Sequence, residues 1–162
     1  MSASNLPMLL AGALGGALFV GIAFALTRRT RGILVRGMIV TALCYVYFAV
    51  KADAGPAWLA AELAGVALYG AMALRGLRGS AWWLVAAWGL HPVWDVALHL
   101  VGSGRTFAPA AFPIACLTWD PVVAGVVAAG ILLRARGVVA PVVTTPAASA
   151  AAAPASSAAR AA

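Results

Sequence analysis

Residues 81–101 read AWWLVAAWGLHPVWDVALHLV, and this stretch decides the class of fold. Its one charged residue is Asp95, and nearly all of its other side chains are apolar or aromatic. A helix that crosses the hydrocarbon layer of a bilayer needs about 20 predominantly apolar residues, because each residue adds about 1.5 Å of length. We therefore expect residues 81–101 to form a transmembrane helix.

The whole chain has the same character. Of its 162 residues, 64% are hydrophobic and 9% are charged, and the mean hydropathy is +0.99. A soluble domain has about 45–50% apolar and about 25% charged residues. This composition excludes a soluble Rossmann or barrel enzyme, a secreted disulfide scaffold and a disordered chain, and it predicts a protein embedded in the lipid bilayer.

Five apolar runs are long enough to span a membrane. They cover residues 6–26, 33–50, 57–74, 81–101 and 112–133. We predict an all-α fold, a polytopic membrane helix bundle with five transmembrane helices in residues 1–136. Residues 137–162 are rich in Ala, Pro and Ser and have no large side chain to bury, so we predict a disordered cytoplasmic tail.

The basic residues predict the orientation of these spans, because Lys and Arg in short loops are retained on the cytoplasmic side. The chain has 11 Lys and Arg against 4 Asp and Glu, a net charge of +7. Only Lys51 and Arg105 fall on one side, and the other side carries Arg28, Arg29, Arg31, Arg36, Arg75, Arg78, Arg134, Arg136 and Arg160. We expect an N-out, C-in topology. The charge excess then reflects topology, and we expect no nucleic-acid partner, since no aromatic-basic binding module is present.

Several small, aromatic and sulfur-containing residues have structural interpretations. Gly12 and Gly16 have the spacing of a close helix contact, which favours packing against another span of the same chain and, as the alternative, a homodimer through this face. Cys44 and Cys116 are expected to behave as small buried hydrophobes. Tryptophans near span ends are expected to be interface anchors: Trp58, Trp82, Trp83 and Trp119.

Ionisable residues inside the spans are the informative feature. Glu62, Asp95 and Asp120 are three of the four acids, and both histidines, His91 and His99, also lie inside a span. The helical rise places the three carboxylates roughly 8, 9 and 12 Å below the outer ends of their spans, at one level. A charge at this depth costs at least about 2.5–3.5 kcal/mol, so such residues need partners or a function.

One helix carries three of these groups at regular spacing. His91, Asp95 and His99 are four residues apart, which predicts a single, slowly turning polar stripe directed into the bundle. Pro92 cannot donate to the carbonyl of Trp88, so we expect a bend in the helix there.

The first functional hypothesis is a divalent metal such as Zn²⁺, because imidazole and carboxylate are its usual ligands. The ligands of this ion would be Asp95, one of the two histidines, and Asp120 or Glu62 from a facing helix. The candidate ligands are Glu62, His91, Asp95, His99 and Asp120, and the candidate catalytic residues are His91, Asp95, His99 and Asp120. An open coordination position would activate water, as in a membrane hydrolase.

Two alternatives stay open. The acids could hold protons while His91 and His99 relay them or bind a polar solute, which would make the protein a component of a proton-coupled or small-solute transporter. The same residues could also hydrogen-bond one another and only fix the packing of the helices.

Two motifs carry a resemblance to a known family. They are His91-Pro-Val-Trp-Asp95 followed by His99, and Pro113-Ile-Ala-Cys-Leu-Thr-Trp-Asp120. The chain resembles the domain-of-unknown-function 6010 family of small bacterial integral membrane proteins, over about residues 6–133. The resemblance implies a multi-span fold, no assigned activity and a multi-pass place in the bacterial plasma (inner) membrane. More distantly, the polar residues are similar to those of zinc-dependent membrane hydrolases of the alkaline ceramidase type. This analogy concerns the residues of the site and not the fold.

The topology can be tested with reporter fusions that end at Gly104 and after Gly137. We expect the first reporter to be active outside and the second in the cytoplasm, because one predicted span, residues 112–133, separates the two fusion points and Arg is retained inside. Activity of both reporters on the same side would contradict the five-span topology.

Overall fold

The computed structural model describes residues 5–26 and 30–137, and this part of the chain is helical. The elements are α1 (Leu6–Ala25), α2 (Thr30–Lys51), α3 (Pro56–Arg78), α4 (Trp82–Trp94), the π-helical η2 (Asp95–Val101), the short 3-10 helix η3 (Ser103–Thr106) and α5 (Ala111–Ala135). Five helices are long and apolar enough to cross a membrane, with α4 and η2 together forming one of them. The predicted helical class is confirmed, together with five helices of the length and composition that a membrane span needs. The predicted tail, apart from Gly137, lies outside the described residues.

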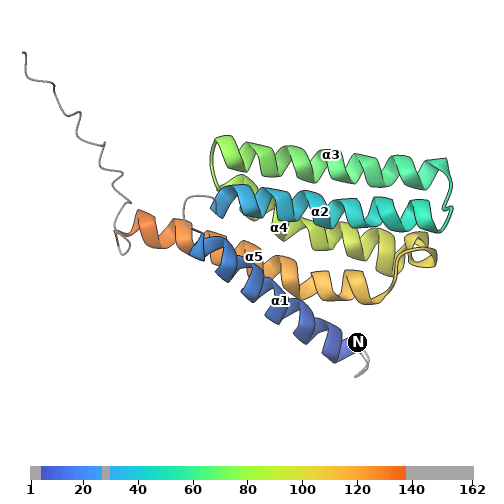
Figure 1. Cartoon of the computed structure of the whole chain (residues 1–162), viewed down its shortest axis with the longest axis horizontal. Helices are drawn as coiled ribbons and strands as arrows, with labels where there is room; N and C mark the ends of the chain where they lie inside the picture. Colours follow the sequence, from blue (N-terminus) through green and yellow to red (C-terminus); the bar gives the residue numbers. More distant parts are fainter. Residues whose placement is uncertain (1–4, 27–29, 138–162) are drawn as a thin grey trace, which may run out of the picture.

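The helices form an up-and-down bundle (Figure 1). Helix α2 lies along α3, α4 packs against α3 and α5, and α1 crosses α5 at the edge of the bundle. One end carries the α2–α3 turn and the α4–α5 connection with η3 (Figure 1). At the other end α2 and α4 begin and α3 and α5 finish, so Arg31, Arg75, Arg78 and Arg134 gather there.

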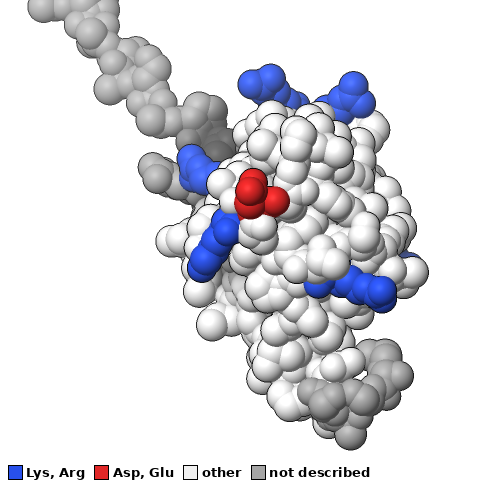
Figure 2. All heavy atoms as spheres, turned by 90° about the vertical axis from the view of Figure 1, so that its right-hand side faces the viewer, with Lys and Arg blue, Asp and Glu red and all other residues white. Residues whose placement is uncertain are grey.

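The bundle exposes apolar side chains on its outer surface and buries its intrahelical acids within a mainly apolar core. Large apolar side chains are exposed along its flanks, with Leu14 at 71% and Leu18 at 66%. The view onto one end shows few charged atoms among mostly uncharged ones (Figure 2). Glu62, Asp95 and Asp120 are at most 2% exposed, so these acids point into the bundle.

Small residues let α1 approach α5 closely. The backbone of Gly16 is so near Trp119 that an added Cβ would lie 2.8 Å from the Trp119 carbonyl oxygen, and Gly12 faces Ala115 and Thr118 in the same way. Packing within the chain, the favoured interpretation of these glycines, is therefore confirmed. A homodimer through this face stays a prediction, and it would require a second chain to replace α5.

One tryptophan differs from its predicted role. Trp119 is not an interface anchor, because its ring packs against Gly15 and stacks on Phe19, with the two ring centroids 5.7 Å apart. Its position near the end of a sequence run was misleading, since α5 begins at Ala111 and places Trp119 more than two turns inside the helix. Trp82 and Trp83, at the start of α4, are 46% and 40% exposed, as an anchor requires.

The α1–α5 contact can be tested by replacing Gly16 with alanine. The added methyl group would lie within 3.0 Å of the Trp119 backbone, so we expect Gly16→Ala to lower the free energy of unfolding in detergent by about 1–3 kcal/mol. Gly21→Ala is the matched control, because nothing lies within 4 Å of its added Cβ. Equal unfolding midpoints for the two variants would contradict this packing.

Candidate metal centre

Two neighbouring helices each present a pair of polar side chains four residues apart. Helix α4 and the start of η2 carry His91 and Asp95, and α5 carries Cys116 and Asp120. Residues at this spacing lie on the same face of a helix. Because α4 packs against α5, the two pairs face each other inside the bundle. We call these four residues the His/Asp/Cys cluster.

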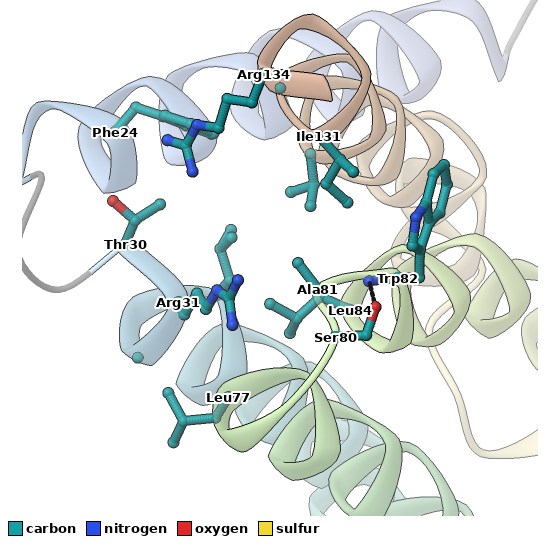
Figure 3. A pocket seen from close by; sticks show the side chains of 14 residues that line it. Phe24, Thr30, Arg31, Leu77, Ser80, Ala81, Trp82, Leu84, Ile131 and Arg134 are labelled. Carbon is teal, nitrogen blue, oxygen red and sulfur yellow. Dashed lines mark hydrogen bonds between the residues drawn. The ribbon is translucent and has the colours of Figure 1, made fainter. Parts of the chain in front are cut away.

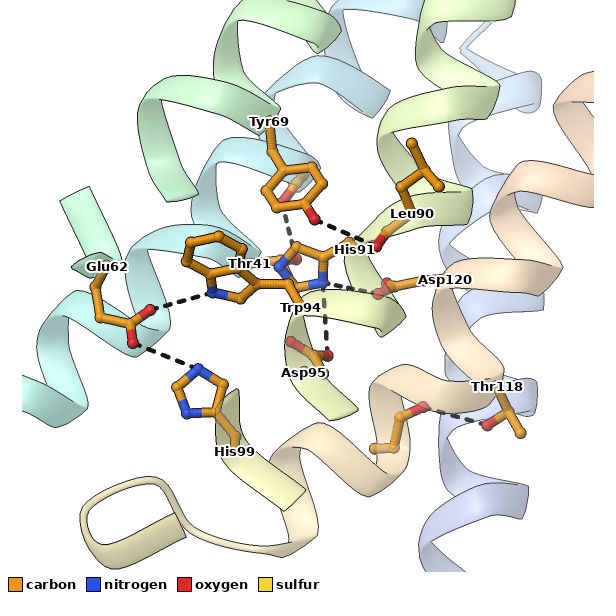
Figure 4. A network of polar contacts seen from close by, with 12 residues as sticks. Thr41, Glu62, Tyr69, Leu90, His91, Trp94, Asp95, His99, Thr118 and Asp120 are labelled. Carbon is orange, nitrogen blue, oxygen red and sulfur yellow. Dashed lines mark hydrogen bonds and ion pairs between the residues drawn. The ribbon is translucent and has the colours of Figure 1, made fainter. Parts of the chain in front are cut away.

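The cluster is compact enough to surround one ion. One nitrogen, oxygen or sulfur atom from each residue lies within 4.8 Å of the corresponding atoms of the other three. His91 Nδ1 is 2.9 Å from Asp120 Oδ2 and 3.6 Å from Asp95 Oδ2, so the imidazole stands between the two carboxylates (Figure 4). All four residues are buried.

The carboxylates of the cluster have too few partners for their burial. Neither oxygen of Asp95 has a hydrogen bond within the part of the chain that the structure describes, and Oδ1 of Asp120 has none either. Both side chains are 0% exposed. Burying a charged group without compensation is strongly unfavourable, so this site needs a cation or bound protons.

A second polar group lies beside the cluster. Glu62 on α3 is 3.5 Å from His99 Nε2 and accepts a 3.5 Å hydrogen bond from Trp94 Nε1 (Figure 4). Glu62 and His99 do not belong to the His/Asp/Cys cluster. Their role as metal ligands stays a prediction, and the structure places them in a second polar group next to the cluster.

The change from α4 to η2 explains this separation. The sequence predicted one continuous stripe of His91, Asp95 and His99 on a regular α-helix, but the helix becomes π-helical at Asp95, three residues after Pro92. A π-helix bonds residue i to residue i+5 and so turns its side chains differently from an α-helix. As a result, His91 and Asp95 lie with the α5 residues, whereas His99 faces α3.

Tyr45 on α2 joins the two groups. Its ring is stacked on His99, with centroids 3.8 Å apart and an interplanar angle of 5°, and it lies 6.2 Å from the His91 ring. Beyond His99, the α4–α5 connection covers the site: Phe107 contacts the imidazole edge-on, and Gly104 comes so close that an added Cβ would be 2.6 Å from His99 Nδ1.

The residues of this site lie within the part of the chain that matches the sequence model of a protein family. The sequence model of a family of unknown function, DUF6010, matches residues 8–131. The chain belongs to this family. No curated protein and no solved structure matches the chain. Every residue of the two polar groups falls inside the DUF6010 region.

Sequence reasoning missed two residues of this DUF6010 site. Cys116 was interpreted as an inert thiol, although its four-residue spacing from Asp120 matches that of His91 and Asp95 and was the available signal. Tyr45 could not be distinguished from Tyr47 by sequence, yet Tyr45 is 1% exposed and Tyr47 is 57% exposed. Both cysteines are free, as expected.

The stacked position of Tyr45 predicts a large difference between the two tyrosines of α2. Tyr45→Leu removes a buried ring and its contact with His99, so we expect the free energy of unfolding to fall by about 1–3 kcal/mol. Tyr47→Leu, on the exposed face, should change it by less than about 0.5 kcal/mol. Thermal unfolding in detergent measures both variants, and similar losses would contradict the stacked arrangement.

Proposed function

We propose that this protein binds a divalent metal ion, with Zn²⁺ as the best match, in the His/Asp/Cys cluster inside the membrane, and that it is a metal-dependent membrane hydrolase. The observation that carries the proposal is the Asp95 carboxylate, which is 0% exposed and has no hydrogen bond to the described residues, in a group of four ligand atoms within 4.8 Å.

The chemistry of the donors favours zinc. His91 supplies nitrogen, Cys116 sulfur, and Asp95 and Asp120 oxygen, a mixed set that Zn²⁺ accepts. Mg²⁺ and Ca²⁺ prefer all-oxygen sites, so a thiolate and an imidazole would be poor ligands for them. A divalent cation also compensates two carboxylates that have no Lys or Arg partner among the described residues.

Four donors permit a catalytic assignment. Hydrolytic zinc sites use three protein ligands and leave the fourth position to water, which the ion activates. His91, Cys116 and Asp120 would hold the ion in this assignment. Asp95, whose oxygens both lack hydrogen bonds, would accept the proton of the activated water. The cluster lies among membrane-spanning helices, which favours a lipid-soluble substrate.

Metal analysis of the purified chain tests the proposal. We expect about one zinc ion per folded chain, because three donors of the cluster and one bound water would complete a tetrahedral coordination shell. Cys116→Ser and Asp120→Asn should lose most of the bound metal. Cys44→Ser and Glu62→Gln are the matched controls, since each removes the same chemical group outside the cluster and should retain the zinc.

The results separate the alternatives. Zinc-free wild-type protein that stays folded and takes up no added Zn²⁺ would show the metal proposal to be wrong. An equal loss of zinc in Cys44→Ser and Cys116→Ser would do the same. If the Asp95→Asn variant keeps its zinc, the result supports the role of Asp95 as a base. If this variant loses its zinc, the result indicates a closed four-ligand site with a structural role.

The second polar group favours a different function, proton transfer. His99 lies 3.5 Å from Glu62, is stacked on Tyr45, and has no hydrogen bond at either ring nitrogen within the described ranges. Acids and histidines in this arrangement are typical of proton relays in transporters. Proton uptake into liposomes that is unchanged by Asp95→Asn and His99→Gln would count against this alternative.

We also propose the cellular setting. The gathering of arginines at one end of the bundle supports a multi-pass membrane protein with this end in the cytoplasm, and we propose the bacterial plasma membrane as its location. The third alternative, a polar cluster that only fixes helix packing, requires that Asp95→Asn with Asp120→Asn destabilise the protein even when no metal binds.

A further inference from the structure

A cleft of about 690 Å³ opens at the arginine-rich end of the bundle, and no residue of the His/Asp/Cys cluster lines it. Figure 3 shows the cleft from close by. All five membrane-spanning helices contribute to its lining. None of the residues of the two polar groups takes part in it. The cleft is thus a separate feature, and the proposed metal centre does not account for it.

The mouth of the cleft is positively charged. Arg31 and Arg134 line it, and their guanidinium groups extend into the space from α2 and α5 (Figure 3). No Asp or Glu is among the described residues that line it. Helices α2 and α4 begin at this cleft, at Thr30 and Trp82, so the positive ends of two helix dipoles add to the same field.

Contacts with α3 hold Arg31 in place. Its Nη1 donates to the carbonyl oxygens of Gly79, at 2.8 Å, and Gly76, at 3.4 Å. These carbonyls belong to the end of α3, where a cation is favourable. A guanidinium group has five N–H donors, so the remaining donors of Arg31 are available to an anion in the cleft.

The deeper lining is apolar. Leu34 and Leu84 are at most 1% exposed, and Phe24 and Ile131 continue the same wall. Trp82 is 46% exposed at the rim, as expected for a ring at the membrane–water interface. A cationic mouth above an apolar wall fits a molecule with an anionic head and a hydrocarbon chain.

We propose that this cleft binds an anionic phospholipid, with its phosphate at Arg31 and Arg134 and part of an acyl chain against Phe24, Leu77 and Ile131. Basic pockets between membrane helices bind anionic head groups in this way. The apolar wall favours a lipid over a soluble phosphate, because a free anion would leave that surface unused.

Native mass spectrometry of the detergent-purified chain tests the site, with phosphatidylglycerol as the anionic lipid and phosphatidylcholine as its zwitterionic control. Wild-type protein should retain phosphatidylglycerol preferentially. Arg134→Gln should weaken its binding roughly five-fold, the effect expected for one basic residue at a lipid phosphate. Arg136→Gln is the matched control, because it removes the same charge two residues away without lining the cleft.

A second variant tests the apolar wall of the cleft without changing the charge at its mouth. An added Cβ at Gly130 would make ordinary contact with Phe24 at 3.8 Å, so Gly130→Leu should fill the cleft and displace the lipid chain. Glycerol 3-phosphate, which has the head group without the chains, should bind much more weakly than the lipid. Equal binding of the two lipids, equal effects of Arg134→Gln and Arg136→Gln, or glycerol 3-phosphate as tight as phosphatidylglycerol would each overturn the proposal.

Discussion

The interaction on which the rest of the structure depends is the one between His91 and the two carboxylates of Asp95 and Asp120. Charged or protonated, these acids cannot face lipid, because nothing there can solvate them. They therefore require α4 and α5 to lie face to face, with the imidazole 2.9 Å from one carboxylate and 3.6 Å from the other. The pairing of these two helices determines where the remaining helices can pack.

The surrounding elements enclose this pair. Helix α1 covers the outer side of α5 through its glycines, which permit close contact where larger side chains would not. Tyr45 closes the site from α2 and connects it to Glu62 and His99. The bundle consequently has a closed polar interior near one end and an open, basic cleft at the other. These two features support two separate proposals, one for chemistry and one for lipid binding.

Much of the fold and part of the site were predictable from local patterns. The length of each apolar run predicted the five helices, and the depth of Asp95 and Asp120 correctly placed them near each other. The sequence did not predict that Glu62 and His99 form a separate pair, because it assumed a regular α-helix through Asp95. Cys116 was missed because a thiol in an apolar helix has no charge to solvate, so hydropathy alone does not distinguish a ligand from a core residue.

The sequence by itself determined which segments are helical and apolar enough to span a membrane, and that the ionisable side chains must turn inward, because both follow from the transfer of side chains between water and hydrocarbon. Only the tertiary structure decided which of these side chains meet. The π-helical turn at η2 and the pairing of α4 with α5 select His91, Asp95, Cys116 and Asp120 and leave His99 to Glu62. Such choices depend on helix rotation and neighbour contacts, which hydropathy does not encode.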